Sequence, residues 1–270
     1  MVTRKSVYLL GLFAIAAGLL SACVNPTHSA NTFAEHMNFE KQIEPGSYFR
    51  HVVYRNARTT PNDTLHVYIE GDGTPYWEPD LIATDPTPRN PLMLRLMALD
   101  AAPSIFLGRP CYFALYRDRA CAPLFWTLRR YGPEVLDSME SVLRSQIQSS
   151  GATRIELIGH SGGGTLAVLL AQRINSVSHV VTIGANLDID AWCELHHFTP
   201  LLGSLNPSDQ PPQRKNLQTT HWVGQNDTNT PPALLQTAAY KRGEAVRVIP
   251  NFDHNCCWEK VWRNILSEDP

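Results

Sequence analysis

Ser161 lies in the pentapeptide Gly159-His160-Ser161-Gly162-Gly163, which fits the pattern G-x-S-x-G. Small residues on both sides of a serine let a sharp turn close and leave the hydroxyl exposed as a nucleophile. Residues 154–158 read as a short buried strand, and residues 165–174 are apolar enough for a packed helix. The pattern therefore predicts a strand–turn–helix unit that presents the Ser161 hydroxyl. The alternative is a glycine-rich turn without chemistry.

Two later residues could activate such a serine, which is a poor nucleophile at neutral pH. It needs a histidine to accept its proton and a carboxylate to orient that histidine. Asp227 follows the predicted strand at residues 220–223, and His254 follows the one at residues 246–249. Both positions are carboxyl ends of strands, where open α/β sheets build their sites. His160, inside the pentapeptide, is expected to point elsewhere.

From about residue 48 to the C-terminus, the order and placement of these residues resemble the α/β-hydrolase family, in which serine, acid and histidine follow in that order. The resemblance implies that Ser161 is the nucleophile, Asp227 the acid and His254 the general base. It also implies a mostly parallel sheet with helices on both faces. Asp227 could instead be a turn residue. The competing acids, which follow the preceding strand, are Asp188 and Asp190.

A tetrahedral intermediate also needs N–H donors for its oxyanion. The backbone N–H of Gly162, directly after the serine, is the first candidate. The segment Glu70-Gly71-Asp72-Gly73 resembles the His-Gly-Gly-Gly loop of the family in position, which makes the N–H of Asp72 or Gly71 the second. The segment departs from that loop at Glu70 and Asp72, whose carboxylates would oppose a developing negative charge unless they point away. A plain glycine-rich turn is the alternative.

The elements that must position these residues alternate between strand and helix, which predicts an α/β domain. Two long segments rich in proline or aromatic residues, 74–90 and 191–216, interrupt the alternation, and we expect them to form walls or lids of a substrate pocket. The predicted strands are residues 51–55, 65–70, 104–107, 154–158, 179–183, 220–223 and 246–249. The predicted helices are residues 92–99, 133–148, 165–174, 232–240 and 258–266.

The first residues have the features of an export signal. Arg4 and Lys5 precede an apolar run at residues 7–20, which is shorter than the roughly 20 residues of a bilayer span. Leu20-Ser21-Ala22-Cys23 resembles the lipobox of bacterial lipoproteins, which implies cleavage before Cys23 and acylation of that residue. Because Val24 follows instead of Asp, we expect attachment to the outer membrane, facing the periplasm. The expected units are a signal peptide (1–22), a lipidated polar tether (23–46) and a hydrolase domain (47–270).

The remaining cysteines are odd in number, and an exported compartment permits disulfides. Cys111 and Cys121 could close a short loop. A bond between Cys256 and Cys257 would be strained, because adjacent Cα atoms lie closer than a disulfide usually requires. Together with His254 these two cysteines match no zinc spacing, so no metal and no cofactor is expected.

Charge and composition narrow the function further. A net charge of -2 without a basic run argues against nucleic acid as a partner. We expect a lipid-anchored serine hydrolase, a carboxylesterase or lipase-like enzyme, that acts on a small-molecule or lipid ester through an acyl-enzyme. The alternatives are an amidase or peptidase, and a non-catalytic envelope lipoprotein that keeps the fold for binding. The carboxylates of Glu70 and Asp72 keep the second alternative open.

Overall fold

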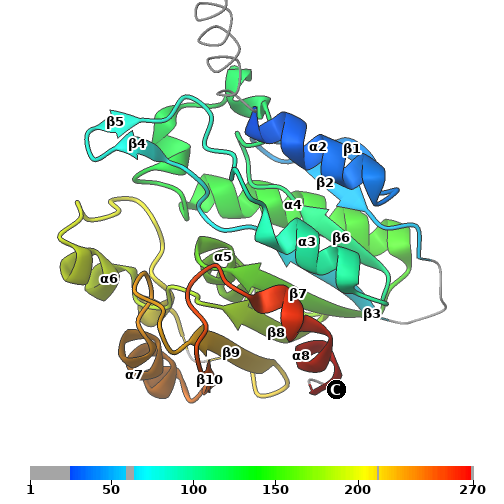
Figure 1. Ribbon diagram of the computed structural model, residues 1–270. Helices are drawn as coiled ribbons and strands as arrows, with labels where there is room; N and C mark the ends of the chain where they lie inside the picture. The colour runs from blue at the N-terminus through cyan, green and yellow to red at the C-terminus, as the bar shows by residue number, and fades with distance from the viewer. Residues whose placement is uncertain (1–24, 59–63, 212, 269–270) are drawn as a thin grey trace, which may run out of the picture.

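The computed structural model describes residues 25–58, 64–211 and 213–268, so the predicted signal peptide and Cys23 lie outside the described residues. Its centre is an eight-stranded sheet with the order β1-β2-β6-β3-β7-β8-β9-β10. The strands from β6 to β10 are parallel, whereas β2 runs antiparallel to β6 and β1 antiparallel to β2 (Figure 1). The predicted α/β class with a mostly parallel sheet is confirmed.

All predicted strands are present, and their ends agree within a few residues. The central ones are almost entirely buried because helices cover both faces of the sheet; every residue of β6, for example, is buried. The strands are β2 (Arg50–Arg55), β3 (Thr64–Ile69), β6 (Ser104–Leu107), β7 (Arg154–His160), β8 (Val177–Ile183), β9 (Gln218–Gly224) and β10 (Ala245–Ile249).

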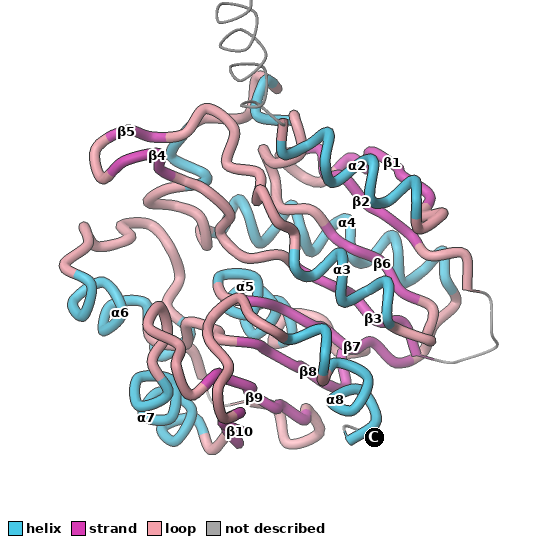
Figure 2. The backbone as a smooth tube through the Cα atoms, viewed as in Figure 1, coloured by secondary structure: helices cyan, strands magenta, loops and turns pink. Residues whose placement is uncertain are grey.

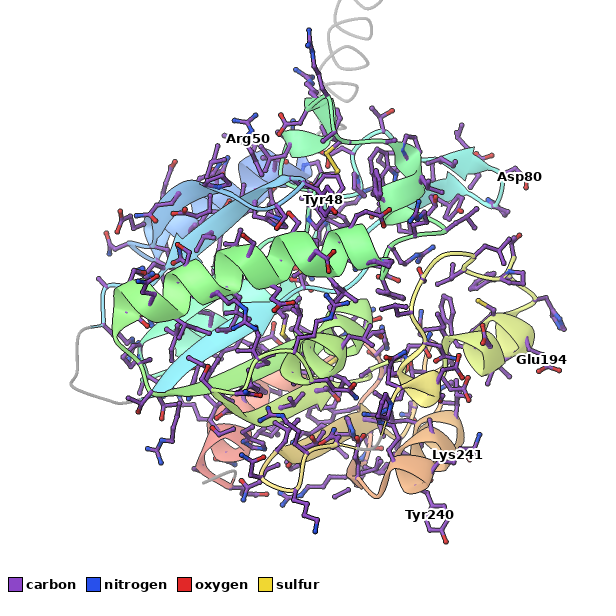
Figure 3. The ribbon with its side chains drawn as sticks, turned by 180° about the vertical axis from the view of Figure 1, so that it is seen from behind. Tyr48, Arg50, Asp80, Glu194, Tyr240 and Lys241 are labelled. Carbon is purple, nitrogen blue, oxygen red and sulfur yellow. A yellow bond between two sulfur atoms is a disulfide. The ribbon has the colours of Figure 1, made fainter. Side chains whose placement is uncertain are left out.

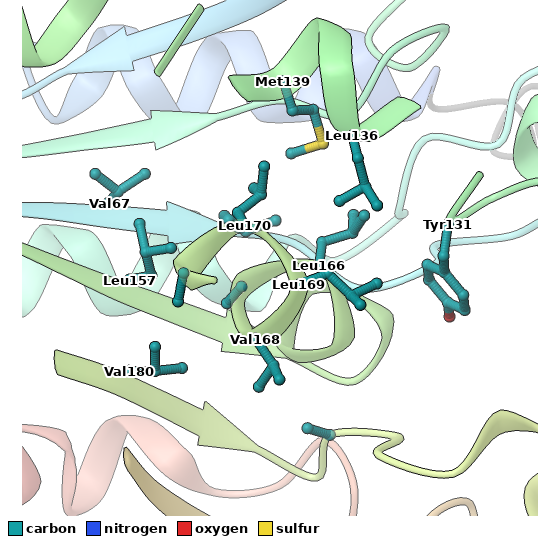
Figure 4. Close-up of a cluster of buried hydrophobic side chains, with 14 of the residues drawn as sticks. Val67, Tyr131, Leu136, Met139, Leu157, Leu166, Val168, Leu169, Leu170 and Val180 are labelled. Atoms are coloured by element: carbon teal, nitrogen blue, oxygen red, sulfur yellow. The ribbon is translucent and has the colours of Figure 1, made fainter. Parts of the chain in front are cut away.

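Two hydrophobic clusters, one on each face of the sheet, hold the helices in place. One contains residues of α4 (Pro133–Ser150), α5 (Gly162–Ala171) and α7 (Pro232–Arg242), and Figure 4 shows Met139, Leu166 and Leu170 within it. The other contains residues of α3 (Leu92–Leu99), the short helix η5 (Trp258–Lys260) and α8 (Trp262–Glu268). The five predicted helices are therefore present, and Figure 2 shows them on both sides of the sheet.

Residues 26–45 differ from the expected polar tether, because they form helix α2 (Pro26–His36) and strand β1 (Glu40–Pro45). The Asn25 side chain caps the helix, and Ala30 and Ala34 are fully buried under it. Strand β1 pairs with β2 over its whole length, although no residue of it is buried. An exposed edge strand needs no apolar alternation, which is why the sequence pattern did not reveal it.

The two interrupting segments contain elements of their own. Residues 74–90 include a hairpin of β4 (Tyr76–Glu78) and β5 (Leu81–Ile82), and the other segment holds most of α6 (Ile189–His196) and the short helix η4 (Pro207–Asp209). Two further short helices, η2 (Leu115–Arg117) and η3 (Pro123–Trp126), lie between β6 and α4. Figure 1 shows the hairpin and α6 at the same end of the sheet.

The cysteines outside the signal region are mostly paired. Cys111 and Cys121 form the predicted disulfide, with their Cα atoms 5.6 Å apart. Cys256 and Cys257 are also bonded to each other, and Cys193 is a buried free thiol. Among the described residues, no helix has the length and apolar character needed to cross a membrane.

Candidate active site

Ser161 stands at the junction of β7 and α5, in the backbone conformation of a strained turn. Its φ of 52° and ψ of -125° lie in a region that residues with a side chain seldom adopt. The Ser161 N–H donates to the carbonyl of Ile183 on β8 (2.8 Å), which fixes the turn to the sheet. A Cβ on Gly159 would collide with the Gly163 carbonyl, so the turn closes only with glycine there. The hydroxyl is thereby presented at the carboxyl end of the central strands.

Asp227 and His254 form a hydrogen-bonded pair in the loops that follow β9 and β10. The His254 Nδ1 lies 2.8 Å from Asp227 Oδ2, and the Asp227 side chain is fully buried. The other carboxylate oxygen, Oδ1, accepts the N–H groups of Asn229 (2.9 Å) and Thr230 (2.7 Å). A Cβ on Gly184, at the end of β8, would lie 2.9 Å from Asp227 Oδ2, so the pair occupies space that only glycine leaves free. The carboxylate is therefore held rigidly against the imidazole.

The surroundings of His254 favour its neutral form. Burial lowers the pKa of His254, the hydrogen bond to Asp227 opposes this, and nearby His160 lowers the pKa further. A neutral imidazole whose Nδ1–H donates to a carboxylate has a free lone pair on Nε2, which is the state a general base needs. Within the described part of the chain, Ser161 Oγ forms no hydrogen bond; such contacts are often long before a substrate binds.

His160 does not point away from the site, as the sequence had suggested, but packs against His254. The two ring centroids are 4.7 Å apart, and His160 Nε2 lies 2.9 Å from the His254 backbone carbonyl. Because a carbonyl only accepts, Nε2 carries the proton and donates. His160 thus fixes the loop that carries His254. No sequence pattern singles out this contact, since it joins residues 94 positions apart.

The glycine-rich segment after β3 lies directly beside the serine. A Cβ on Gly71 would be 3.2 Å from Ser161 Cβ. The Gly71 N–H is already used, because it donates to Glu70 Oε1 (3.1 Å), while Glu70 Oε2 accepts the N–H of Met93 at the start of α3 (3.0 Å). Among the described residues, the N–H groups of Asp72 and Gly162 have no acceptor. The two free donors next to Ser161 are thus those of Asp72 and Gly162.

The Asp72 carboxylate lies in a buried cluster of charged and phenolic groups. It pairs with Arg109 and with Arg130 Nη1 (2.8 Å), and it accepts the Tyr131 hydroxyl (2.7 and 2.9 Å). The Tyr112 hydroxyl donates to the Asp72 carbonyl (2.8 Å). Burial alone would raise the pKa of the Asp72 carboxyl, but the charges of Arg130 and Arg109 outweigh it and hold that pKa well below its usual range.

The sequence alone suggested that the Asp72 carboxylate would oppose a developing negative charge, and this cluster removes that difficulty. It is defined by Asp72, Arg109, Arg130, Tyr112 and Tyr131. Two guanidinium groups face the Asp72 carboxylate, so its negative charge is compensated beside the serine turn. The carboxylate also touches the turn, because a Cβ on Gly162 would collide with Asp72 Oδ1. Nothing in the local sequence links these residues, which come from three separated segments.

The competing acids do not reach His254. Asp188 caps α6 by accepting the N–H of Ala191 (3.2 Å), and Asp190 accepts the side-chain amide of Asn206 (3.1 Å). Asp227 is the carboxylate that contacts His254 within the described residues. Cys256 and Cys257, bonded to each other, have no thiolates to offer a metal beside His254.

Ser161, His254, Gly71 and Asp72 line one cavity of about 950 Å³. Its walls come from both interrupting segments, and Figure 3 shows their outer ends at Asp80 and Glu194. The Trp192 Nε1 and His196 Nε2 of α6 both donate to the Asn229 carbonyl (2.9 and 2.7 Å), which fastens this wall to the loop of Asp227. The aromatic and aliphatic residues of the walls are Tyr76, Trp77, Leu92, Leu128, Trp192, Phe198 and Leu201.

Comparison with known proteins agrees with this architecture. No family model and no curated protein matches the sequence. Among solved structures, the Pyrococcus furiosus esterase Pf2001 is similar over 87% of this chain and 93% of its own, with a TM-score of 0.60 and 10% identity. A membrane phospholipase A described as a bacterial virulence factor is similar over 98% and 97%, with a TM-score of 0.55 and 14% identity.

A third similar structure is XC6422 from Xanthomonas campestris, described as a member of the a/b serine hydrolases without a lid. It covers 85% of this chain and 94% of its own, with a TM-score of 0.57 and 10% identity. At such identities the likeness concerns the fold. The chain has the α/β-hydrolase fold.

Proposed function

We propose that this protein is a serine hydrolase that cleaves carboxylic esters through an acyl-enzyme on Ser161. The observation that carries the proposal is the hydrogen-bonded His254–Asp227 pair (2.8 Å) on the wall of the same cavity as the strained Ser161 turn. A chain that kept the fold only for binding would not need a buried carboxylate aligned on a neutral imidazole beside a partly exposed serine.

The reaction divides into two steps that share one set of groups. His254 Nε2 accepts the Ser161 proton while Oγ attacks the ester carbonyl, and the N–H groups of Gly162 and Asp72 receive the oxyanion. Collapse of the intermediate expels the alcohol, which takes the proton from His254. Water then attacks the acyl-enzyme while His254 Nε2 accepts its proton. The C–Oγ bond breaks, His254 returns the proton to Ser161 Oγ, and the carboxylic acid leaves.

The cavity favours esters over peptides as substrates. Its aromatic and aliphatic walls suit an acyl chain, and its volume of about 950 Å³ admits a small-molecule or lipid ester. Active serine esterases react irreversibly with fluorophosphonates, so the test is labelling of the purified domain (residues 25–270). Wild type should be labelled and should hydrolyse 4-nitrophenyl esters; Ser161→Ala should do neither. His254→Ala should lose both as well. A folded wild type that neither labels nor turns over esters would refute the proposal.

We further propose that Cys23 carries a lipid anchor that holds the protein at the outer membrane, facing the periplasm. The support is the Leu20-Ser21-Ala22-Cys23 sequence behind an apolar run, with Val24 next. Several acyl chains, at about 0.8 kcal/mol per buried methylene, hold a protein firmly on a bilayer. A Cys23→Ala variant of the full chain should be released from the membrane fraction, and its persistence there would contradict the anchor.

A further inference from the structure

Arg130 is a buried cation that reaches the wall of the active-site cavity. Its side chain is only 5% exposed, yet the residue lines the cavity together with Ser161 and Asp72. Its Nε donates to the Thr127 carbonyl (2.6 Å) and its Nη1 to Asp72 Oδ2 (2.8 Å). Its Nη2 has no hydrogen-bond partner in the described part of the chain, and it is not among the polar atoms sealed from solvent. The open donor of this guanidinium therefore faces the cavity.

Arg130 shares its carboxylate partner with a second buried cation. Arg109, whose side chain is 1% exposed, shares the same carboxylate, and Asp72 is the acid that pairs with either guanidinium among the described residues. Buried charges in proteins are normally paired, since an unpaired one is costly. The two guanidinium groups thus share one carboxylate, and neither has a carboxylate to itself. Arg130 can therefore pair with a second anionic oxygen at the donor that faces the cavity.

Apart from Asp72, the other charged residues of the cavity form no ion pair with Arg130 in the described part of the chain. Of the two other cations there, Arg95 pairs with Glu259 and Arg89 lies over the Trp77 ring. Glu70 is occupied by the N–H groups of Gly71 and Met93. Glu78 and Asp80 are exposed residues of the hairpin, and Figure 3 places Asp80 at its outer end. By contrast, Arg130 contacts the Asp72 carboxylate that lies against Gly162, so it is one side chain removed from the serine turn.

We propose that Arg130 forms a subsite for an anionic oxygen of the substrate, a carboxylate or phosphate a few atoms from the scissile ester. The inference rests on the proposed ester hydrolysis and names its substrate class: esters whose acyl or alcohol part carries a negative charge. Arg130 binds that group with Nη2 while Nη1 stays on Asp72. Guanidinium forks suit carboxylate and phosphate oxygens, and the bonds they form there are charge-assisted.

The test compares matched neutral and anionic esters on the purified domain. For the acyl side, 4-nitrophenyl hexanoate is paired with 4-nitrophenyl hydrogen adipate, which has a carboxylate at the chain end. For the alcohol side, 2-nitrophenyl hexanoate is paired with 3-hexanoyloxy-4-nitrobenzoate. The readout is the ratio of kcat/KM for the anionic ester to that for its neutral partner. We expect a ratio of about ten or more in at least one pair, since hydrogen bonds to charged groups are the stronger class, and the pair concerned identifies the side that carries the charge.

Three variants separate recognition from structure. Arg130→Gln should bring the ratio to about one, and Arg130→Lys should keep part of it because the charge remains. Arg109→Gln is the matched control: it also removes a guanidinium from Asp72, but it does not line the cavity, so it should slow both esters alike and keep the ratio. Because the ratio is taken within one variant, a general loss of activity does not alter it.

The outcomes separate the proposed subsite from the proposed ester hydrolysis. Ratios near one for wild type in both pairs overturn the subsite, and so does a preference that survives in Arg130→Gln. If Arg130→Gln does not fold, the wild-type ratios together with Arg130→Lys and Arg109→Gln give the same decision. Failure of the proposed function has another signature, namely no turnover of the neutral esters and no fluorophosphonate labelling.

Discussion

Two of the carboxylates at the candidate active site, those of Asp227 and Asp72, differ in the charge of their partners. Asp227 is surrounded by the N–H groups of Asn229 and Thr230 and by a neutral imidazole, so its full charge acts on His254. Asp72 is held by Arg109 and Arg130, so its charge is spent on keeping a backbone segment in place. The two aspartates therefore differ in role. Asp227 acts electrostatically on the histidine, whereas Asp72 holds the backbone beside Ser161 in place.

The largest expected effect comes from Asp227→Asn. The amide can still accept both backbone N–H groups, so the free energy of unfolding should change by about 1 kcal/mol or less. The imidazole loses the charge that orients and stabilises its protonated form, and kcat should fall about ten-thousandfold, as for the acid of other serine triads. Steady-state kinetics and urea unfolding on the same sample measure both. A loss below about tenfold would remove Asp227 from the proposed mechanism.

Asp72→Asn should have the opposite effect, with a large loss of stability and a smaller loss of activity. Two buried guanidinium groups lose their counter-charge, so the free energy of unfolding should fall by about 3 kcal/mol or more. The Asp72 N–H shifts with the loop, and kcat should drop only about ten- to hundredfold. The wild-type pKa of this carboxyl is lowered, so its stabilisation is present above the unfolded pKa of about 3.9 and is lost as the pH falls toward the folded pKa. The difference in the free energy of unfolding between wild type and Asp72→Asn should therefore become smaller at acid pH.

The control for that prediction is Asp118→Asn, which removes the partner of Arg50 from an exposed pair. Surface ion pairs contribute about 1 kcal/mol or less. If Asp118→Asn and Asp72→Asn destabilise the protein equally, the cluster around Asp72 is no stronger than a surface contact, and the comparison between the two carboxylates loses its basis.

The smallest effect concerns His160→Gln, which keeps an N–H donor for the His254 carbonyl but removes a titratable ring. Activity requires neutral His254, so kcat/KM should rise with pH through an apparent pKa below the ordinary value of about 6.5. Because His160 contributes to lowering that pKa, the variant should move the acid limb to higher pH with little loss at pH 8. His160→Phe, which cannot donate, should also lower the plateau. An unmoved acid limb in His160→Gln would show that His160 acts only through packing.

Whether a site residue could be predicted from the sequence depends on how far apart in the chain its contacts lie. Ser161 was recognisable because its turn depends on adjacent glycines, and Asp227 and His254 because each directly follows an apolar strand. The cluster around Asp72 could not be found in this way, since Arg109 and Arg130 come from loops with no periodic pattern. The fold shows the same division: apolar strands were predicted well, whereas β1 and the β4–β5 hairpin carry no apolar alternation.

The early start of α2 sets how far the domain could move from the proposed lipid anchor at Cys23. A flexible segment of residues 25–46 would let the domain roam about 25 Å from its attachment point. With Asn25 capping α2 at Pro26, an anchor at Cys23 would lie two residues from the folded chain, a span of about 7 Å at most. The start of α2 would then stay next to the bilayer surface. The cavity would remain within one domain's width of the lipids.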